Sequence, residues 1–125
     1  MTCNSEVAAL DRALAIAGET VVLRRQYGVS PSVFVDVECR GFVRGYRPEE
    51  LIGGISQTDI FVILSPTEIE RAKWPGGSGL SSTTDPRVPK KGDKLVVRGA
   101  LRNVEAAGPI YVRGELVRIE MRVLG

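Results

Sequence analysis

The 125-residue sequence contains no histidine, so the commonest general base and metal ligand is missing. The side chains left for acid–base chemistry are carboxylates, and two close pairs stand out, Glu49 with Glu50 and Glu68 with Glu70. A carboxyl group works as a general acid at neutral pH only when desolvation raises its pKa. Both pairs lie in polar sequence where solvation explains them. An enzyme with carboxylate chemistry is therefore kept only as a minor hypothesis.

Metal and covalent chemistry have equally little support. Cys3 and Cys39 are the two cysteines, too few for a disulfide framework and without the spacing of a zinc site. A glycine cluster at Gly76, Gly77 and Gly79 lacks the GxxxxGK[ST] pattern of a phosphate loop and the GxGxxG pattern of a dinucleotide turn. The sequence predicts no cofactor, no metal and no catalytic residue, and we expect the protein not to be an enzyme.

Composition is typical of one folded domain. The chain is 43% apolar with a formal net charge of +2, and its length suits a single domain covering residues 1–125. No apolar run approaches the length of a membrane span, and the apolar segment Val7–Ala17 lacks the basic flank of a secretory signal. We expect no membrane association and a location in the cytoplasm of the cell that makes the protein.

The elements that would position any site are mostly strands. Residues 91–125 read as a meander, with turns at Lys91–Asp93, Ala106–Pro109 and Arg113–Gly114. Within Glu115–Val123, apolar and charged residues alternate with a period of two, which predicts a strand with one buried and one wet face. This meander carries 7 basic and 4 acidic side chains, which makes it mildly cationic.

The first half of the chain adds one helix and three further strands. Helical spacing predicts a short amphipathic helix at about residues 5–17, and period-two patterns predict a hairpin from residues 20–27 and 33–44. The apolar run 60–64 predicts a central strand, followed by a helical turn capped by Ser65 or Thr67. Residues 46–59 read as a turn of helix within a loop. The fold class predicted is mainly β: a small antiparallel β-barrel with one short N-terminal helix and long loops.

A long loop is predicted at residues 73–90, where 11 of 18 residues are Gly, Ser, Thr or Pro. Loops of this length are either functional or mere surface excursions, and the composition leaves both open. Trp74 at its start is more typical of a local anchor or a protein contact than of a base-stacking platform.

Small β-barrels also bind single-stranded nucleic acids, through exposed aromatics and a cationic groove. Here Phe34 and Phe42 would share a face with Asp36 and Glu38, whose charges would repel phosphate. A stand-alone nucleic-acid-binding barrel is the alternative hypothesis.

Several stretches together resemble the head-completion or stopper-type neck proteins of the head-to-tail connector of long-tailed bacteriophages. These stretches are GETVVLRR from Gly18, VECRGFVRGYRPEELIGG from Val37, SPTEI from Ser65, DPRVPKKGDKLVVRGALRNVE from Asp85, and the terminal GELVRIEMRVLG. The resemblance covers nearly the whole chain. It implies a β-barrel that assembles into a homo-oligomeric ring, binds portal or adaptor and tail proteins, and does no chemistry.

The resemblance also implies a location in the virion neck, with the host cytoplasm as the site of assembly. It implies that loops facing the ring lumen help retain packaged DNA, by contact with phosphate that does not depend on sequence. The candidate DNA-facing residues around the long loop are Lys73, Arg87, Lys90 and Lys91. The candidate subunit or partner interface residues are Tyr46, Leu51, Ile52, Trp74 and Leu80.

Overall fold

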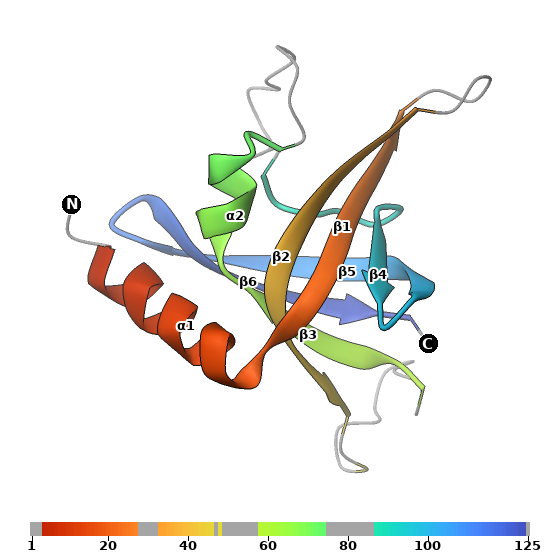
Figure 1. Ribbon diagram of the computed structural model, residues 1–125, viewed down its shortest axis with the longest axis horizontal. Coiled ribbons are helices and arrows are strands. Elements are labelled where there is room, and N and C mark those ends of the chain that lie inside the picture. The colour runs from red at the N-terminus through yellow and green to blue at the C-terminus, as the bar shows by residue number, and fades with distance from the viewer. Residues whose placement is uncertain (1–3, 28–32, 47, 49–57, 75–86, 125) are drawn as a thin grey trace.

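The computed structural model describes residues 4–27, 33–46, 48, 58–74 and 87–124. These residues form two helices and six strands: α1 (Asn4–Ala17), β1 (Glu19–Tyr27), β2 (Val33–Gly45), β3 (Ile60–Leu64), α2 (Pro66–Arg71), β4 (Lys94–Val97), β5 (Ala100–Val112) and β6 (Glu115–Val123). The strands close into one antiparallel barrel in the order β1-β2-β3-β6-β5-β4 (Figure 1). The predicted fold class is confirmed.

Five of the strands send alternate side chains into the barrel, whereas β5 contributes only Val104 to the buried core. The predicted hairpin is β1 paired with β2, in a register that runs from Glu19 opposite Gly41 to Tyr27 opposite Val33. β3 joins β2 to β6, and β1 closes the barrel against β4. The buried core comprises Val21, Leu23, Val37, Cys39, Val62, Leu64, Ile69, Trp74, Leu95, Val97, Val104, Leu116, Ile119, Met121 and Val123.

Helix α1 lies against the outside of the barrel and ends where the sequence predicts. The N–H of Gly18 donates to the carbonyl oxygen of Leu14 at 2.8 Å, and a Cβ at this glycine would lie only 2.5 Å from that oxygen. Leu14 is buried against the barrel, whereas Ile16 is 86% exposed. Two residues along a helix correspond to a rotation of about 160°, so Ile16 points away from the barrel.

Helix α2 fixes the chain that leaves β3. Ser65 is its N-cap, since its hydroxyl accepts from the N–H of Thr67 at 3.2 Å, and Pro66 occupies the first turn. The hydroxyl of Thr67 donates to Asp11 of α1 at 2.7 Å, which joins the two helices. After α2, the N–H of Trp74 donates to the carbonyl of Ile69 at 3.0 Å, so Trp74 is held next to the core.

The C-terminal meander is present, with two tight turns of the same kind. Arg98 and Gly99 have φ angles of 51° and 81°, and Arg113 and Gly114 have 52° and 80°. Positive φ at both central residues is the hallmark of the type I′ hairpin turn, whose twist matches that of the strands. The predicted alternation in β6 is confirmed: Val117, which is buried, begins a series in which every second residue to Val123 is buried.

The turn predicted at Ala106–Pro109 is wrong, because β5 continues through these residues to Val112. The pairing of β5 with β6 shifts register between Val104 and Ala106, which places a bulge at Glu105. β4 pairs only with Ala100–Asn103, so the later part of β5 has no described strand on its other side. Proline is tolerated at such an edge because the strand there needs no second set of hydrogen-bond donors.

Candidate functional site

The most constrained polar cluster in the described chain is a buried ion pair between Arg25 on β1 and Asp93 just before β4. The guanidinium donates from Nε to Oδ1 at 3.1 Å and from Nη2 to Oδ2 at 2.8 Å. The two side chains are only 8% and 4% exposed. A two-pronged, desolvated Arg–carboxylate pair of this kind fixes geometry in a way that a single surface contact cannot.

Three more contacts extend this pair into what we call the clasp, comprising Arg25, Trp74, Val88 and Asp93. The Arg25 Cζ lies 4.6 Å from the centroid of the Trp74 ring, within cation–π range. Its Nη2 also donates to the Val88 carbonyl at 3.3 Å. The indole Nε1 of Trp74 donates to the Val35 carbonyl on β2 at 2.8 Å. The clasp thus joins Trp74 and Val88 to the same part of the barrel; most of the predicted loop between them, residues 75–86, lies outside the described residues.

Asp93 also organises the turn that leads into β4. Its Oδ2 accepts from the N–H of Lys90 at 2.9 Å, and its own N–H donates to the Lys90 carbonyl at 3.0 Å. The N–H of Val104 on β5 donates to the Asp93 carbonyl at 2.9 Å. One aspartate therefore connects β1, β5 and residues 88–93, and these become a single rigid support.

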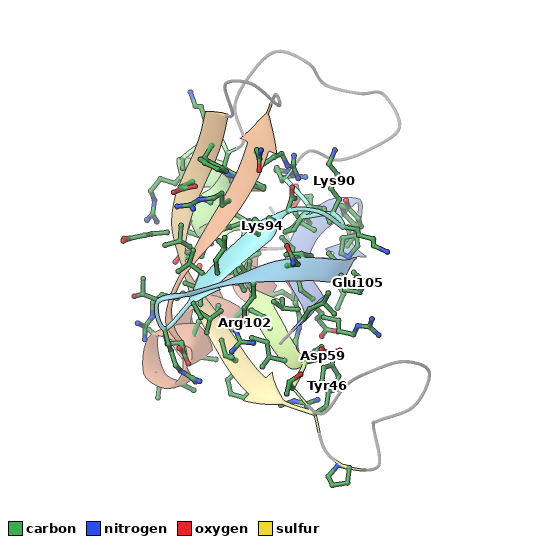
Figure 2. The ribbon with its side chains drawn as sticks, turned by 90° about the vertical axis from the view of Figure 1, so that its right-hand side faces the viewer. Tyr46, Asp59, Lys90, Lys94, Arg102 and Glu105 are labelled. Carbon is green, nitrogen blue, oxygen red and sulfur yellow. The ribbon has the colours of Figure 1, made fainter. Side chains whose placement is uncertain are left out.

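The four cations predicted to face DNA surround the clasp, and the structure divides them into two kinds. Arg87 pairs with Glu70 of α2, and the Lys91 amine lies 3.4 Å from Glu105. Lys73 and Lys90 are exposed and have no carboxylate partner among the described residues. Figure 2 shows Lys90 in the upper part of the view, above Lys94. Lys73 and Lys90 therefore leave more positive charge unbalanced than Arg87 and Lys91, which are paired with carboxylates.

The structure corrects the interface role predicted for Trp74. This side chain is only 3% exposed and belongs to the core, because its ring fills the space beside Arg25 and its N–H is satisfied by β2. Tyr46 is half-buried and packs edge-to-face on Phe61, with ring centroids 6.2 Å apart. The other predicted interface residues, Leu51, Ile52 and Leu80, lie outside the described residues.

The groups considered for catalysis have structural roles where they are described. Glu68 accepts from the backbone N–H of Arg40 at 3.4 Å, Glu70 pairs with Arg87, and Glu49 and Glu50 lie outside the described residues. Burial raises the pKa of the Cys39 thiol to about 12, so it stays protonated and a poor nucleophile at neutral pH. Among the described residues, no group of three or more acidic or cysteine side chains could hold a metal ion.

Arg25 and Asp93 were not among the residues singled out from the sequence, although β1 contained a signal. Val21, Leu23 and Arg25 alternate on the face that enters the barrel, and an arginine on such a face requires a buried partner. The partner could not be identified from the sequence, since Asp93 lies 68 positions away and reads as an ordinary turn residue.

No described helix has the length and apolarity needed to cross a membrane.

The candidate site is defined by its own geometry: a buried clasp that holds two chain segments, bordered by two exposed lysines. No protein-family model matches the chain, and a search of curated proteins gives no match.

Proposed function

We propose that this chain is a non-enzymatic structural subunit of a bacteriophage neck. It forms a ring that joins the portal or adaptor to the tail and helps to retain packaged DNA. The observation that best supports this role is the clasp, because it anchors Trp74 and Val88, on either side of residues 75–86, to a closed barrel wall through Arg25 and Asp93. The resemblance in sequence to stopper-type neck proteins points to the same role.

A rigid base suits a segment that must contact DNA or a neighbouring subunit. Binding residues generally lie on loops whose ends are positioned by a stable scaffold. Lys73 and Lys90, at the two ends of the segment, add a positive charge that attracts phosphate without sequence preference. A single weak contact becomes effective when a ring presents many copies of it to the same DNA.

One residue from each predicted set, Lys90 for DNA and Tyr46 for a protein partner, can be compared in position. In Figure 2, Lys90 lies towards one end of the molecule and Tyr46 towards the other. A neck subunit needs such a separation, because DNA and protein partners are contacted by different parts of the chain. This separation supports the proposal, and it gives each surface its own test.

The first test is deletion of the gene, followed by electron microscopy of the particles produced. We expect filled heads that lose DNA and tails that remain unattached, with joined particles restored by the wild-type gene in trans. Joined, infectious particles formed without the protein would contradict the proposal.

The second test removes charge from the DNA-facing lysines. A Lys73→Gln/Lys90→Gln chain should join heads to tails but leave heads that leak DNA, measured by nuclease sensitivity of the particles. The matched control is Arg12→Gln/Arg113→Gln, which removes the same charge from exposed positions away from the clasp and should retain DNA. If the isolated monomer instead binds single-stranded DNA tightly and joins no particle, the stand-alone nucleic-acid-binding function replaces the neck function.

A further inference from the structure

An apolar groove lies on the outside of the barrel between α1 and the β5–β6 hairpin. Its walls are Glu6, Ala9, Leu10, Ala13, Ile110, Val117 and Arg118, and its volume is about 450 Å³. That volume is large enough for several side chains of a partner. Ala9, Ala13 and Ile110 are all exposed, so this apolar wall faces solvent in the single chain.

The rim of the groove carries an unbalanced negative charge. Arg118 is neutralised by Glu120, whose carboxylate lies 2.9 Å from its Nε. Glu6 has no cationic partner among the described residues and accepts only from the Ser5 hydroxyl, at 3.1 Å. A partner with an apolar side chain and a nearby cation would therefore complement this groove.

An exposed apolar side chain beside a cation is found on the opposite side of the same chain. The type I′ turn between β4 and β5 is followed by Leu101, which is 56% exposed, and the turn residue Arg98 has a side chain 69% exposed. All four residues from Arg98 to Leu101 are exposed. Among the described residues Arg98 pairs with Glu19, in an exposed salt bridge that contributes little, so a carboxylate of a partner can replace Glu19. This turn is convex and apolar with an arginine that can exchange partners, whereas the groove is concave and apolar with a carboxylate, Glu6, that is unpaired in the described chain.

The positions of the two features suit head-to-tail association. Figure 1 shows the β4–β5 turn at the right end of the long axis and the β5–β6 hairpin beside α1 at the left end. β5 connects them, so both features are fixed to one continuous strand. Two different surfaces on opposite sides of a subunit allow a ring to close, whereas a single self-complementary surface stops at a dimer.

We infer that the groove between α1 and the β5–β6 hairpin receives the β4–β5 turn of a second copy of this chain. Leu101 then packs on Ala9, Ala13 and Ile110, and Arg98 approaches Glu6. This inference rests on the proposed ring function and specifies which surfaces form the ring.

The test is sedimentation velocity of the full chain over its whole soluble concentration range. We expect the wild type to form oligomers with increasing concentration, and Leu101→Glu and Ala13→Glu each to keep the chain monomeric. The matched control is Ala15→Glu, which makes the same exchange at an exposed alanine about 160° around the helix axis from Ala13 and should associate like the wild type. Thermal unfolding of each variant confirms that it is folded.

Mixing distinguishes a head-to-tail contact from a two-fold one. Leu101→Glu keeps an intact groove and Ala13→Glu keeps an intact turn, so the mixture should form dimers but nothing larger. Arg98→Glu and Glu6→Arg should each raise the dissociation constant about tenfold, which corresponds to about 1.4 kcal/mol, and the double exchange should restore it.

Three results would overturn the inference: a wild-type chain that is monomeric at every soluble concentration, equal loss in Ala15→Glu, or no dimer in the mixture. If rings form through these surfaces but the protein joins no heads or tails, the contact stands and the neck function fails. If particles assemble normally with Leu101→Glu, the neck function stands and this contact fails.

Discussion

Arg24 and Arg25 are neighbours on β1, and each forms an ion pair with an aspartate at 2.8 Å, yet the two pairs are in opposite environments. Arg24 faces outward and pairs with Asp36 on β2, with side chains 28% and 40% exposed. Arg25 faces into the barrel and pairs with Asp93, with side chains 8% and 4% exposed. Each guanidinium also lies over an aromatic ring, Phe34 for Arg24 and Trp74 for Arg25.

The difference shows that distance alone does not determine what an ion pair contributes. Water screens the outer pair and can replace either partner, so its loss costs little. The inner pair is desolvated, so removal of one member leaves the other charged in the core. The inner pair therefore determines where the chain segments on either side of residues 75–86 lie. The outer pair lies on the surface of the barrel and contributes little to its stability.

Breaking the inner pair should have the largest effect. Asp93→Asn leaves Arg25 buried without a counter-charge and should lower the free energy of unfolding by about 3–5 kcal/mol. Urea unfolding followed by far-UV circular dichroism measures this change. The double variant Arg25→Met/Asp93→Asn should recover part of the loss, because no buried charge remains; a double variant less stable than Asp93→Asn would contradict our account of the clasp.

Changing the aromatic partner should have an intermediate effect. Trp74→Phe keeps a ring beside Arg25 but removes the N–H that satisfies the partly buried Val35 carbonyl, which should cost about 1–3 kcal/mol. The matched outer variant is Phe34→Leu, at a side chain 50% exposed, which should change stability by about 0.5 kcal/mol or less. Equal losses in both variants, measured by urea unfolding, would mean that the inner ring has no special role.

Breaking the outer pair should have the smallest effect on stability but a clear effect on titration. The hydrogen bond from Arg24 lowers the pKa of Asp36 below its ordinary value. A lowered carboxyl pKa contributes stability above the unfolded-state value, and that contribution is lost as the pH falls through the folded-state value. Arg24→Met should raise the Asp36 pKa, observed by NMR titration of its carboxyl carbon, while the urea midpoint at neutral pH hardly moves.

Much of the fold could be predicted from the sequence because it depends on local patterns. The period-two alternation in Glu115–Val123 specifies a strand with a buried face, and Gly18 marks the end of a helix by its lack of a Cβ. The Ser65 cap likewise depends on residues only two positions apart.

The parts that the sequence did not predict depend on contacts between distant residues. Ala106–Pro109 has the composition of a turn, but β6 pairs with it and keeps it extended. The sequence leaves Trp74 as either a local anchor or a protein contact, and only the contacts with Arg25 of β1 and a carbonyl of β2 identify it as an anchor. The clasp could be found only in three dimensions, because residues from three separate segments form it.

β5 places a geometric limit on any assembly built from this chain. Leu101 and Ile110 are nine residues apart on one extended strand, and at about 3.4 Å per residue this corresponds to roughly 30 Å. In a ring built through these two contacts, the length of β5 would thus set the distance between neighbouring subunits. A one-residue insertion would turn every later side chain to the other face, unless a second bulge like that at Glu105 absorbed it. Without such a bulge, the spacing could change only in steps of two residues, roughly 7 Å each.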